Sequence, residues 1–268
     1  MKKLAALIVA GALTAGLLSG CSSKEDKTIK VGASITPHAE ILRACTDILA
    51  EEGYTLEVQE FTDYVLPNQA VESGELDANF FQHQPYLDDF NEKNKTHLVS
   101  VAKIHYEPFG IYGGKLDSLD KVAEGSTFAI PNDGTNEARA LFLMEAQGLI
   151  KLKEGTDFTA TILDIAENPL NLKIEEMDAA LLARALEDVD FALINGNYAL
   201  QAGLNAEDDA LAVEDKDSAG GATYANVLCV KEGHENDEKI QALAKALCSE
   251  TVREYIEATY NGSVVPMF

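Results

Sequence analysis

Residues 28–49 read TIKVGASITPHAEILRACTDIL. Within them the spacing of apolar residues changes from the alternation of a strand to the spacing of a helix. Residues 28–34 alternate and are rich in β-branched side chains, which predicts a strand. Thr36 and Pro37 then offer an N-cap and a proline at the first helical position. Apolar residues follow at helical spacing as far as Leu49, so a helix directly succeeds the strand.

The same alternation continues outward from this unit to the end of the chain. Further strands are predicted at 56–61, 78–81, 127–130, 160–164, 189–194 and 226–230, and further helices at 64–73, 85–91, 136–147, 179–187, 198–202 and 237–257. Strands that alternate with helices indicate α/β layers with a largely parallel sheet.

Two stretches interrupt the alternation and are interpreted as crossovers between lobes. One is extended, at 98–112, and the other is rich in turn residues, at 218–223. We therefore expect one lobe from residues 28–111 together with 224–268, and a second lobe from residues 112–223. Small ligands bind in the cleft between the lobes of such folds.

The N-terminus predicts export and lipid attachment. Lysines at positions 2 and 3 precede an apolar stretch at 4–18, and residues 18–21 read LSGC. This is the order of a signal peptide, and the apolar stretch is shorter than the ~20 residues of a membrane-spanning helix. The ending resembles a bacterial lipobox, which implies a signal peptide over residues 1–20, acyl chains such as palmitate on Cys21, and a tether over residues 21–27. The alternative is an ordinary signal peptide followed by a chance cysteine.

The acidic composition limits the partners. The chain of 268 residues has a formal net charge of −24 at pH 7. The electrostatic field of so negative a protein repels nucleic acid and anionic lipid. We therefore expect no nucleic-acid partner. We also expect a soluble body that is held at the membrane by its acyl chains. Three internal cysteines, Cys45, Cys229 and Cys248, form no Cys-x-x-Cys pair and are better interpreted as small apolar residues than as a disulfide.

No motif points to catalysis. The sequence contains no glycine-rich phosphate loop, no Gly-x-Ser-x-Gly and no His-Glu-x-x-His. Its five histidines are dispersed, whereas a zinc site needs clustered ligands. The many carboxylates fall on predicted helix faces, and nothing singles out a glycosidase pair among them. We expect no enzyme activity, no cofactor and no metal.

Eight uncommon strings occur in one order along the mature chain. They are TPHAEIL (36–42), DYVLPN (63–68), DANFFQHQPYL (77–87), EPFGIY (107–112), IPNDGTN (130–136), ENP (167–169), ALINGNYA (192–199) and YANV (224–227). Together they resemble the methionine-binding lipoprotein family of ABC importers, also called the NlpA family. Glu107 and Phe109 depart from residues that other members carry at these positions, and both could line the cleft.

The resemblance implies a fold, a ligand and a partner. The fold is a two-lobed α/β architecture like that of type II periplasmic binding proteins, with two crossovers and the ligand in the inter-lobe cleft. The ligand is L-methionine, and the protein delivers it to a membrane permease with a cytoplasmic ATPase. The location is the extracytoplasmic face of the cell membrane.

Three polar residues are candidates for binding a zwitterionic amino acid. Arg139 falls in the first turns of a predicted helix, where paired donors and the positive helix end suit a carboxylate; the alternative is a surface ion pair. Asn195 ends an apolar strand and Asn226 opens another, and an amide both donates and accepts hydrogen bonds; the alternative is turn chemistry. Family position favours a ligand role for all three.

Aromatic residues are candidates for contacting a thioether, which is favoured near aromatic rings. Phe81, Tyr64 and Tyr106 could form this wall with His83 at its edge, and ordinary core packing is the alternative for each. His38 is a weaker candidate, since it could simply pack near a helix start.

Other functions remain open from the sequence. A related carrier could bind D-methionine, a methionine-containing dipeptide or another apolar amino acid. A protein of a different class would be a surface adhesin or interaction lipoprotein with a vestigial cleft, although such a cleft need not keep Arg139, Asn195 and Asn226.

Overall fold

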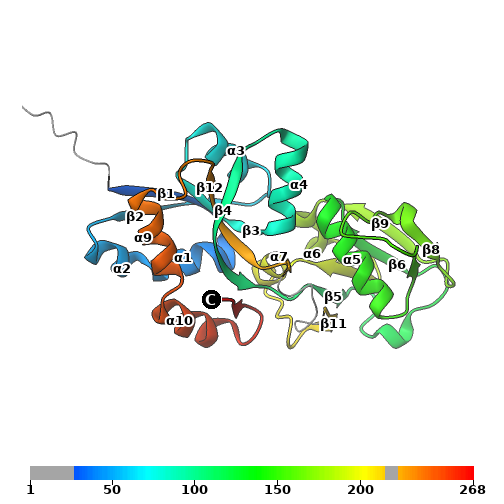
Figure 1. Cartoon of the computed structure of the whole chain (residues 1–268). Helices are drawn as coiled ribbons and strands as arrows, with labels where there is room; N and C mark the ends of the chain where they lie inside the picture. Colours follow the sequence, from blue (N-terminus) through cyan, green and yellow to red (C-terminus); the bar gives the residue numbers. More distant parts are fainter. Residues whose placement is uncertain (1–26, 215–222) are drawn as a thin grey trace, which may run out of the picture.

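The structure is a computed structural model that describes residues 27–214 and 223–268. It has two lobes, one holding the N-terminal and C-terminal elements and the other holding the middle of the chain (Figure 1). The first lobe contains a six-stranded sheet with the order β13-β4-β12-β3-β1-β2, and the second a five-stranded sheet with the order β11-β5-β10-β6-β9. This arrangement confirms the predicted two-lobed α/β fold.

Three predictions fall on residues outside the described ranges. These are the signal peptide, the lipidated Cys21 with the tether as far as residue 26, and the second crossover over 218–222. Within the described ranges, no helix is both long and apolar enough to cross a membrane.

The first lobe combines parallel and antiparallel strands. Its strands are β1 (Thr28–Ser34), β2 (Thr55–Phe61), β3 (Ala78–His83), β4 (Leu98–Tyr106), β12 (Asn226–Lys231) and β13 (Val265–Pro266). Its helices are η1 (Ile35–Ala39), α1 (Glu40–Ala44), α2 (Thr46–Glu51), α3 (Leu66–Ser73), α4 (Gln84–Asn94), α9 (Glu238–Leu247) and α10 (Glu250–Tyr260). Strand β1 is parallel to β2 and β3, whereas β12 is antiparallel to both β3 and β4.

Apolar side chains cover both faces of this sheet. In β12, Leu228 and Val230 belong to a core cluster with residues of α1, α9 and α10, while Val227 and Cys229 belong to another with residues of α3 and α4. Alternate side chains of a strand point to opposite faces. The strand is therefore buried on both sides, which explains its continuous apolar sequence.

The second lobe repeats this plan on a smaller sheet. Its strands are β5 (Gly110–Gly113), β6 (Thr127–Pro131), β9 (Lys173–Met177), β10 (Phe191–Ile194) and β11 (Ala210–Val213), with a separate pair β7 (Lys151–Leu152) and β8 (Ile165–Glu167). Its helices are α5 (Gly134–Ala146), α6 (Leu182–Ala185) and α7 (Gly196–Gln201), with short turns η2 (Leu119–Lys121), η3 (Ile162–Asp164) and η4 (Ala179–Leu181). Phe191 and Leu193 pack on the α5 side, and Ala192 and Ile194 on the α6 and α7 side.

The chain enters the second sheet between β4 and β5 and leaves it after β11. Strand β5 begins at Gly110, slightly ahead of the predicted change of lobe at residue 112. We keep the division into residues 28–111 with 224–268 and residues 112–223 as a proposal.

Some predicted elements are wrong. Both sheets are mixed rather than largely parallel, because the strands next to the crossovers pair antiparallel. The predicted strand at 160–164 is instead the turn η3 followed by β8. The predicted helix at 237–257 is two helices, because Ser249 caps α10 by accepting a hydrogen bond from the backbone N–H of Val252.

The three described cysteines are free, with Cys45 and Cys229 buried and Cys248 partly buried. Burial raises the pKa of the Cys45 thiol to about 12 and also raises that of Cys229. These thiols stay protonated at neutral pH, so they behave as small apolar side chains, as predicted.

Candidate functional site

A cavity of about 20 Å³ lies where the two lobes meet. That volume is enough for about one water molecule. Its lining comes from both lobes and from the connection between β4 and β5: Tyr64, Phe81, Gln82, His83, Tyr86, Glu107, Asn136, Arg139, Asn195, Gly196, Asn197 and Asn226. Polar and aromatic side chains from both lobes therefore converge on one place in the molecule.

Arg139 supplies the positive charge of the cavity. It lies in α5, whose first turn is capped by Asp133 accepting from the backbone N–H of Asn136. Its Nε donates to Oε2 of Glu214 at 2.9 Å, and its Nη2 donates to Oε1 of Glu214 and to the backbone carbonyl of Glu107. Burial alone would lower the pKa of Arg139, but the Glu214 carboxylate holds it above its ordinary value. The guanidinium is thus a fixed cation with one edge already paired.

Aromatic rings surround this guanidinium. Its central carbon lies 4.3 Å from the ring centroid of Tyr224 and 5.0 Å from that of Phe109. Cations over aromatic faces are stabilised electrostatically. The rings restrict Arg139 to one orientation.

Amide side chains from both lobes form a polar wall. Oδ1 of Asn136 accepts from Nδ2 of Asn195 at 2.7 Å and from Nε2 of His83 at 3.2 Å. The proton of His83 therefore lies on Nε2, because its Nδ1 accepts a hydrogen bond from the backbone N–H of Tyr86. Oδ1 of Asn195 is buried and has no hydrogen-bond partner. It is an acceptor that a ligand donor can satisfy.

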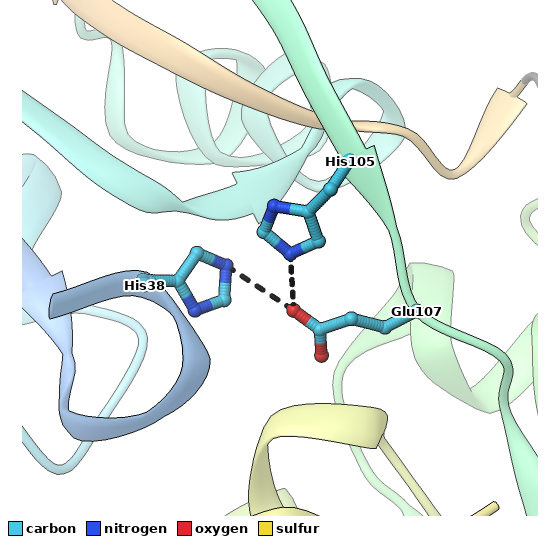
Figure 2. Close-up of side chains that lie close together, drawn as sticks. All are labelled: His38, His105 and Glu107. Carbon is cyan, nitrogen blue, oxygen red and sulfur yellow. Dashed lines mark hydrogen bonds and ion pairs between the residues drawn. The ribbon is translucent and has the colours of Figure 1, made fainter. Parts of the chain in front are cut away.

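Glu107 supplies the negative charge, and Figure 2 shows two histidines directed at one of its carboxylate oxygens. Its Oε1 lies 2.7 Å from Nε2 of His105 and 3.3 Å from Nε2 of His38. Burial raises the pKa of Glu107, opposed by His38, by Arg139 and by a backbone N–H of Asn197. Oε2 points toward Gly196, where an added Cβ would come within 2.8 Å of it.

Aromatic side chains form the apolar wall. The ring of Tyr64 lies 5.8 Å from that of Phe81 and 5.6 Å from that of Tyr86. Burial raises the pKa of Tyr64, so its hydroxyl remains a donor, to Oδ1 of Asn197 at 2.5 Å. The wall therefore offers aromatic surface to a ligand, while the hydroxyl of Tyr64 already has its hydrogen-bond acceptor in Asn197.

The cavity contains all the predicted ligand residues except Tyr106. The hydroxyl of Tyr106 donates to Oε1 of Glu214 at 2.5 Å, so this ring supports Arg139 instead of lining the cavity. His38 is also outside the lining, but its Nε2 lies 3.0 Å from Oδ1 of Asn226.

Five lining residues were not predicted: Gln82, Tyr86, Asn136, Gly196 and Asn197. Each of them lies within three positions of a predicted residue, so the end of strand β3 and the turn after β10 were the available signals. Of the two residues that could line the cleft as departures from other family members, Glu107 does so and Phe109 does not. Glu214 carried no such signal, since only the fold brings it to Arg139.

His38, His105 and Glu107 are also the described residues that could hold a metal ion, with ligand atoms within 4.8 Å of one another. A ligating histidine donates its second ring N–H to a partner. Here Nδ1 of both His38 and His105 lacks one. Their Nε2 atoms already face acceptors, so we interpret the cluster as hydrogen-bonded rather than metal-binding.

Comparison with known proteins gives a family and relatives of similar length. A family model described as NlpA lipoprotein matches residues 29–268. The membrane lipoprotein TpN32 of Treponema pallidum is 42% identical, over 95% of this chain and 93% of its own. The D-methionine-binding lipoprotein MetQ of Salmonella typhi is 41% identical, over 95% of both chains.

A solved structure extends this similarity to three dimensions. It is a nutrient-binding protein from Burkholderia cenocepacia bound to methionine, with a TM-score of 0.85 and 45% identity. The match covers 90% of this chain and 100% of that one. The likeness therefore includes both lobes.

Proposed function

This chain belongs to the NlpA lipoprotein family, and from that premise we propose that it is the lipid-anchored substrate-binding protein of an ABC importer and captures methionine between its lobes. The observation that carries the proposal is the cavity in which Arg139 and Glu107 provide opposite charges beside an aromatic wall. A free amino acid needs this combination, because it presents a carboxylate, an ammonium group and one side chain.

Each part of methionine has a partner in the cavity. Glu214 takes the Nε and Nη2 edge of Arg139, so the ligand carboxylate would approach the Nη1 side and the amides of Asn136 and Asn226. The ammonium group would donate to Glu107 and to Oδ1 of Asn195. Charge-assisted hydrogen bonds of this kind are shorter and stronger than neutral ones.

The side chain would lie against Tyr64, Phe81 and Tyr86. A thioether is polarizable and gains from contact with aromatic rings. Relatives named as binding methionine or D-methionine support this ligand, and so does the relative solved with methionine bound. We favour the L enantiomer, with D-methionine, a methionine-containing dipeptide or another apolar amino acid as alternatives within the same class.

The proposed role implies a permease and a membrane as partners. A carrier that releases an intact amino acid needs a membrane permease with a cytoplasmic ATPase to use it. The acyl chains on Cys21 would keep the carrier at the extracytoplasmic face of the cell membrane, since two or more chains hold a protein there stably.

Two measurements test the proposal. Mass spectrometry of the small molecules released on denaturing the purified protein should detect methionine. Calorimetry on refolded, ligand-free protein should show one site for L-methionine and weaker binding of leucine; D-methionine and glycyl-methionine complete the series. Absence of binding to every one of these compounds would contradict the proposal and favour an adhesin or interaction lipoprotein.

A further inference from the structure

Two buried imidazoles of the first lobe converge on a single oxygen of Glu107 (Figure 2). His105 in β4 and His38 in η1 both direct Nε2 toward Oε1, at 2.7 and 3.3 Å. Phe80 packs edge-on against both rings. His38 and His105 are at most 1% exposed and Glu107 is 5% exposed. Water is therefore excluded from this side of the carboxylate, and Oε2 is the oxygen that faces Gly196 and the cavity.

The hydrogen bonds determine where the ring protons lie. Nδ1 of each ring is buried without a partner. A proton there would be a buried, unsatisfied N–H donor, which proteins avoid more strictly than an unsatisfied acceptor. The protons therefore belong on Nε2, where His105 donates to Glu107 and His38 donates toward Glu107 and Oδ1 of Asn226. Donors that converge on a carboxylate favour its ionised form.

We propose that His105, assisted by His38, is a positioning residue that keeps Glu107 ionised and aimed at the ligand's ammonium group, so that ligand capture is linked to the proton of Glu107. This deepens the methionine-binding function proposed above and rests on it. The histidines themselves do not touch the ligand.

Glu107 is the carboxyl group among the residues that line the cavity. Burial lowers the pKa of His38 to about 4 and that of His105 to about 3, so both stay neutral at physiological pH. Burial also lowers the pKa of His83 to about 3 and raises that of Tyr64, and both line the same cavity. The remaining groups around Glu107 are Arg139 from α5 and a backbone N–H of Asn197 from α7.

The direction of the pH dependence follows. Burial raises the pKa of Glu107, and an ammonium group binds the carboxylate but not the neutral acid. Affinity is therefore independent of this proton above the pKa of Glu107 in the free protein. Below it, affinity falls by about tenfold per pH unit, until the pKa of the ligand-bound state is reached. Below the free-protein pKa, binding releases a proton.

The first test needs no ligand. Carboxyl groups of glutamate are labelled with ¹³C, the Glu107 resonance is assigned with Glu107→Gln, and its titration is followed by NMR. His105→Leu removes the donor, His105→Gln keeps a donor nitrogen at the Nε2 position, and His97→Gln is a control at an exposed histidine. His105→Leu should move the midpoint of Glu107 upward by roughly one pH unit, while the other two leave it near the wild-type value. An unmoved midpoint in a folded His105→Leu protein overturns the proposal.

The second test uses the wild-type protein, so it does not depend on the variant folding. Calorimetric titration with methionine in buffers of different ionisation enthalpy counts the protons released on binding. Below the midpoint found by NMR, about one proton should be released per ligand, and none with Glu107→Gln. Binding without proton release would overturn the linkage. No methionine binding at any pH would instead count against the proposed function, while the NMR titration would still test how His105 positions Glu107.

Discussion

Arg139 presents one whole edge of its guanidinium to Glu214, with Nε 2.9 Å from Oε2 and Nη2 bonded to Oε1. The same carboxylate accepts from the hydroxyl of Tyr106 and from the backbone N–H of Phe109. It thus joins α5, the connection between the sheets and the end of β11. The cation is oriented before any ligand arrives, which reduces the ordering that binding would otherwise require.

Removal of Arg139 should affect both binding and stability. Arg139→Met should weaken methionine binding by more than ~1.4 kcal/mol, a factor of ten. It should also lower the free energy of unfolding by about 3–5 kcal/mol, because it leaves a buried carboxylate unpaired. The double variant Arg139→Met with Glu214→Leu should regain most of the stability but not the affinity. Urea denaturation and calorimetry measure the two effects, and unchanged affinity in Arg139→Met would remove this residue from the site.

Glu214 should influence affinity although it does not line the cavity. Glu214→Gln removes the charge that holds Arg139, so methionine affinity should fall by roughly tenfold. Glu57→Gln, at an exposed position in β2, is the matched control and should bind normally. If both variants bind like the wild type, Arg139 does not need its partner to be oriented.

The glycine after Asn195 should be required by the close approach of Glu107. A Cβ at Gly196 would lie 2.6 Å from Cβ of Glu107. Gly196→Ala should therefore displace Glu107 or separate the lobes and weaken methionine binding at least tenfold. Gly134→Ala is the control, because its nearest neighbour is the flexible end of Lys93 at 3.2 Å. Calorimetry showing equal losses for both would indicate a general effect of added volume.

Methionine should close the lobes and stabilise the protein. The cavity takes residues from both lobes, so a ligand that contacts them favours the closed arrangement. At a hundredfold excess over the dissociation constant, binding should add about 2.7 kcal/mol to the free energy of unfolding. X-ray scattering should show a smaller radius of gyration, and chromatography should recover methionine unchanged. A different product would identify an enzyme instead of a carrier.

The anchor prediction concerns a residue outside the described ranges. Cys21→Ala removes the acylated thiol, so the protein should be released from membranes or should retain its signal peptide. Cell fractionation with mass determination of the N-terminus distinguishes these outcomes. A cleaved Cys21→Ala protein that still sediments with membranes would disprove the lipoprotein interpretation.

The elements that the sequence predicted best are those in which the pattern of apolar residues reflects burial. Strand β10 is apolar at every position because both of its faces are covered, and its range was found almost completely. Strand β9 was missed because it lies at the edge of its sheet and keeps Lys173, Glu175 and Glu176 exposed. A period-two signal is weak when only one face is partly buried.

The candidate site was predicted where functional residues lie next to strand ends. Asn195 follows β10 and Asn226 opens β12, and both line the cavity. The pairing of Arg139 with Glu214 spans 75 positions and depends on how the sheets are connected, so no local pattern encodes it. The same holds for His38, which only the tertiary fold brings to Glu107, whereas His105 lies two positions before Glu107 in the sequence.

The position of β12 between β3 and β4 has a consequence for how the chain folds as it is made. All five strands of the second sheet lie between Gly110 and Val213, so that sheet can form from a continuous stretch of nascent chain. The first sheet stays divided until residues 226–231 emerge, because its β3 and β4 have no other strand to join them. Pairing across so long a sequence separation is slow. The first lobe therefore completes last, and loss of the C-terminal segment would leave edges of β3 and β4 unpaired and exposed to aggregation.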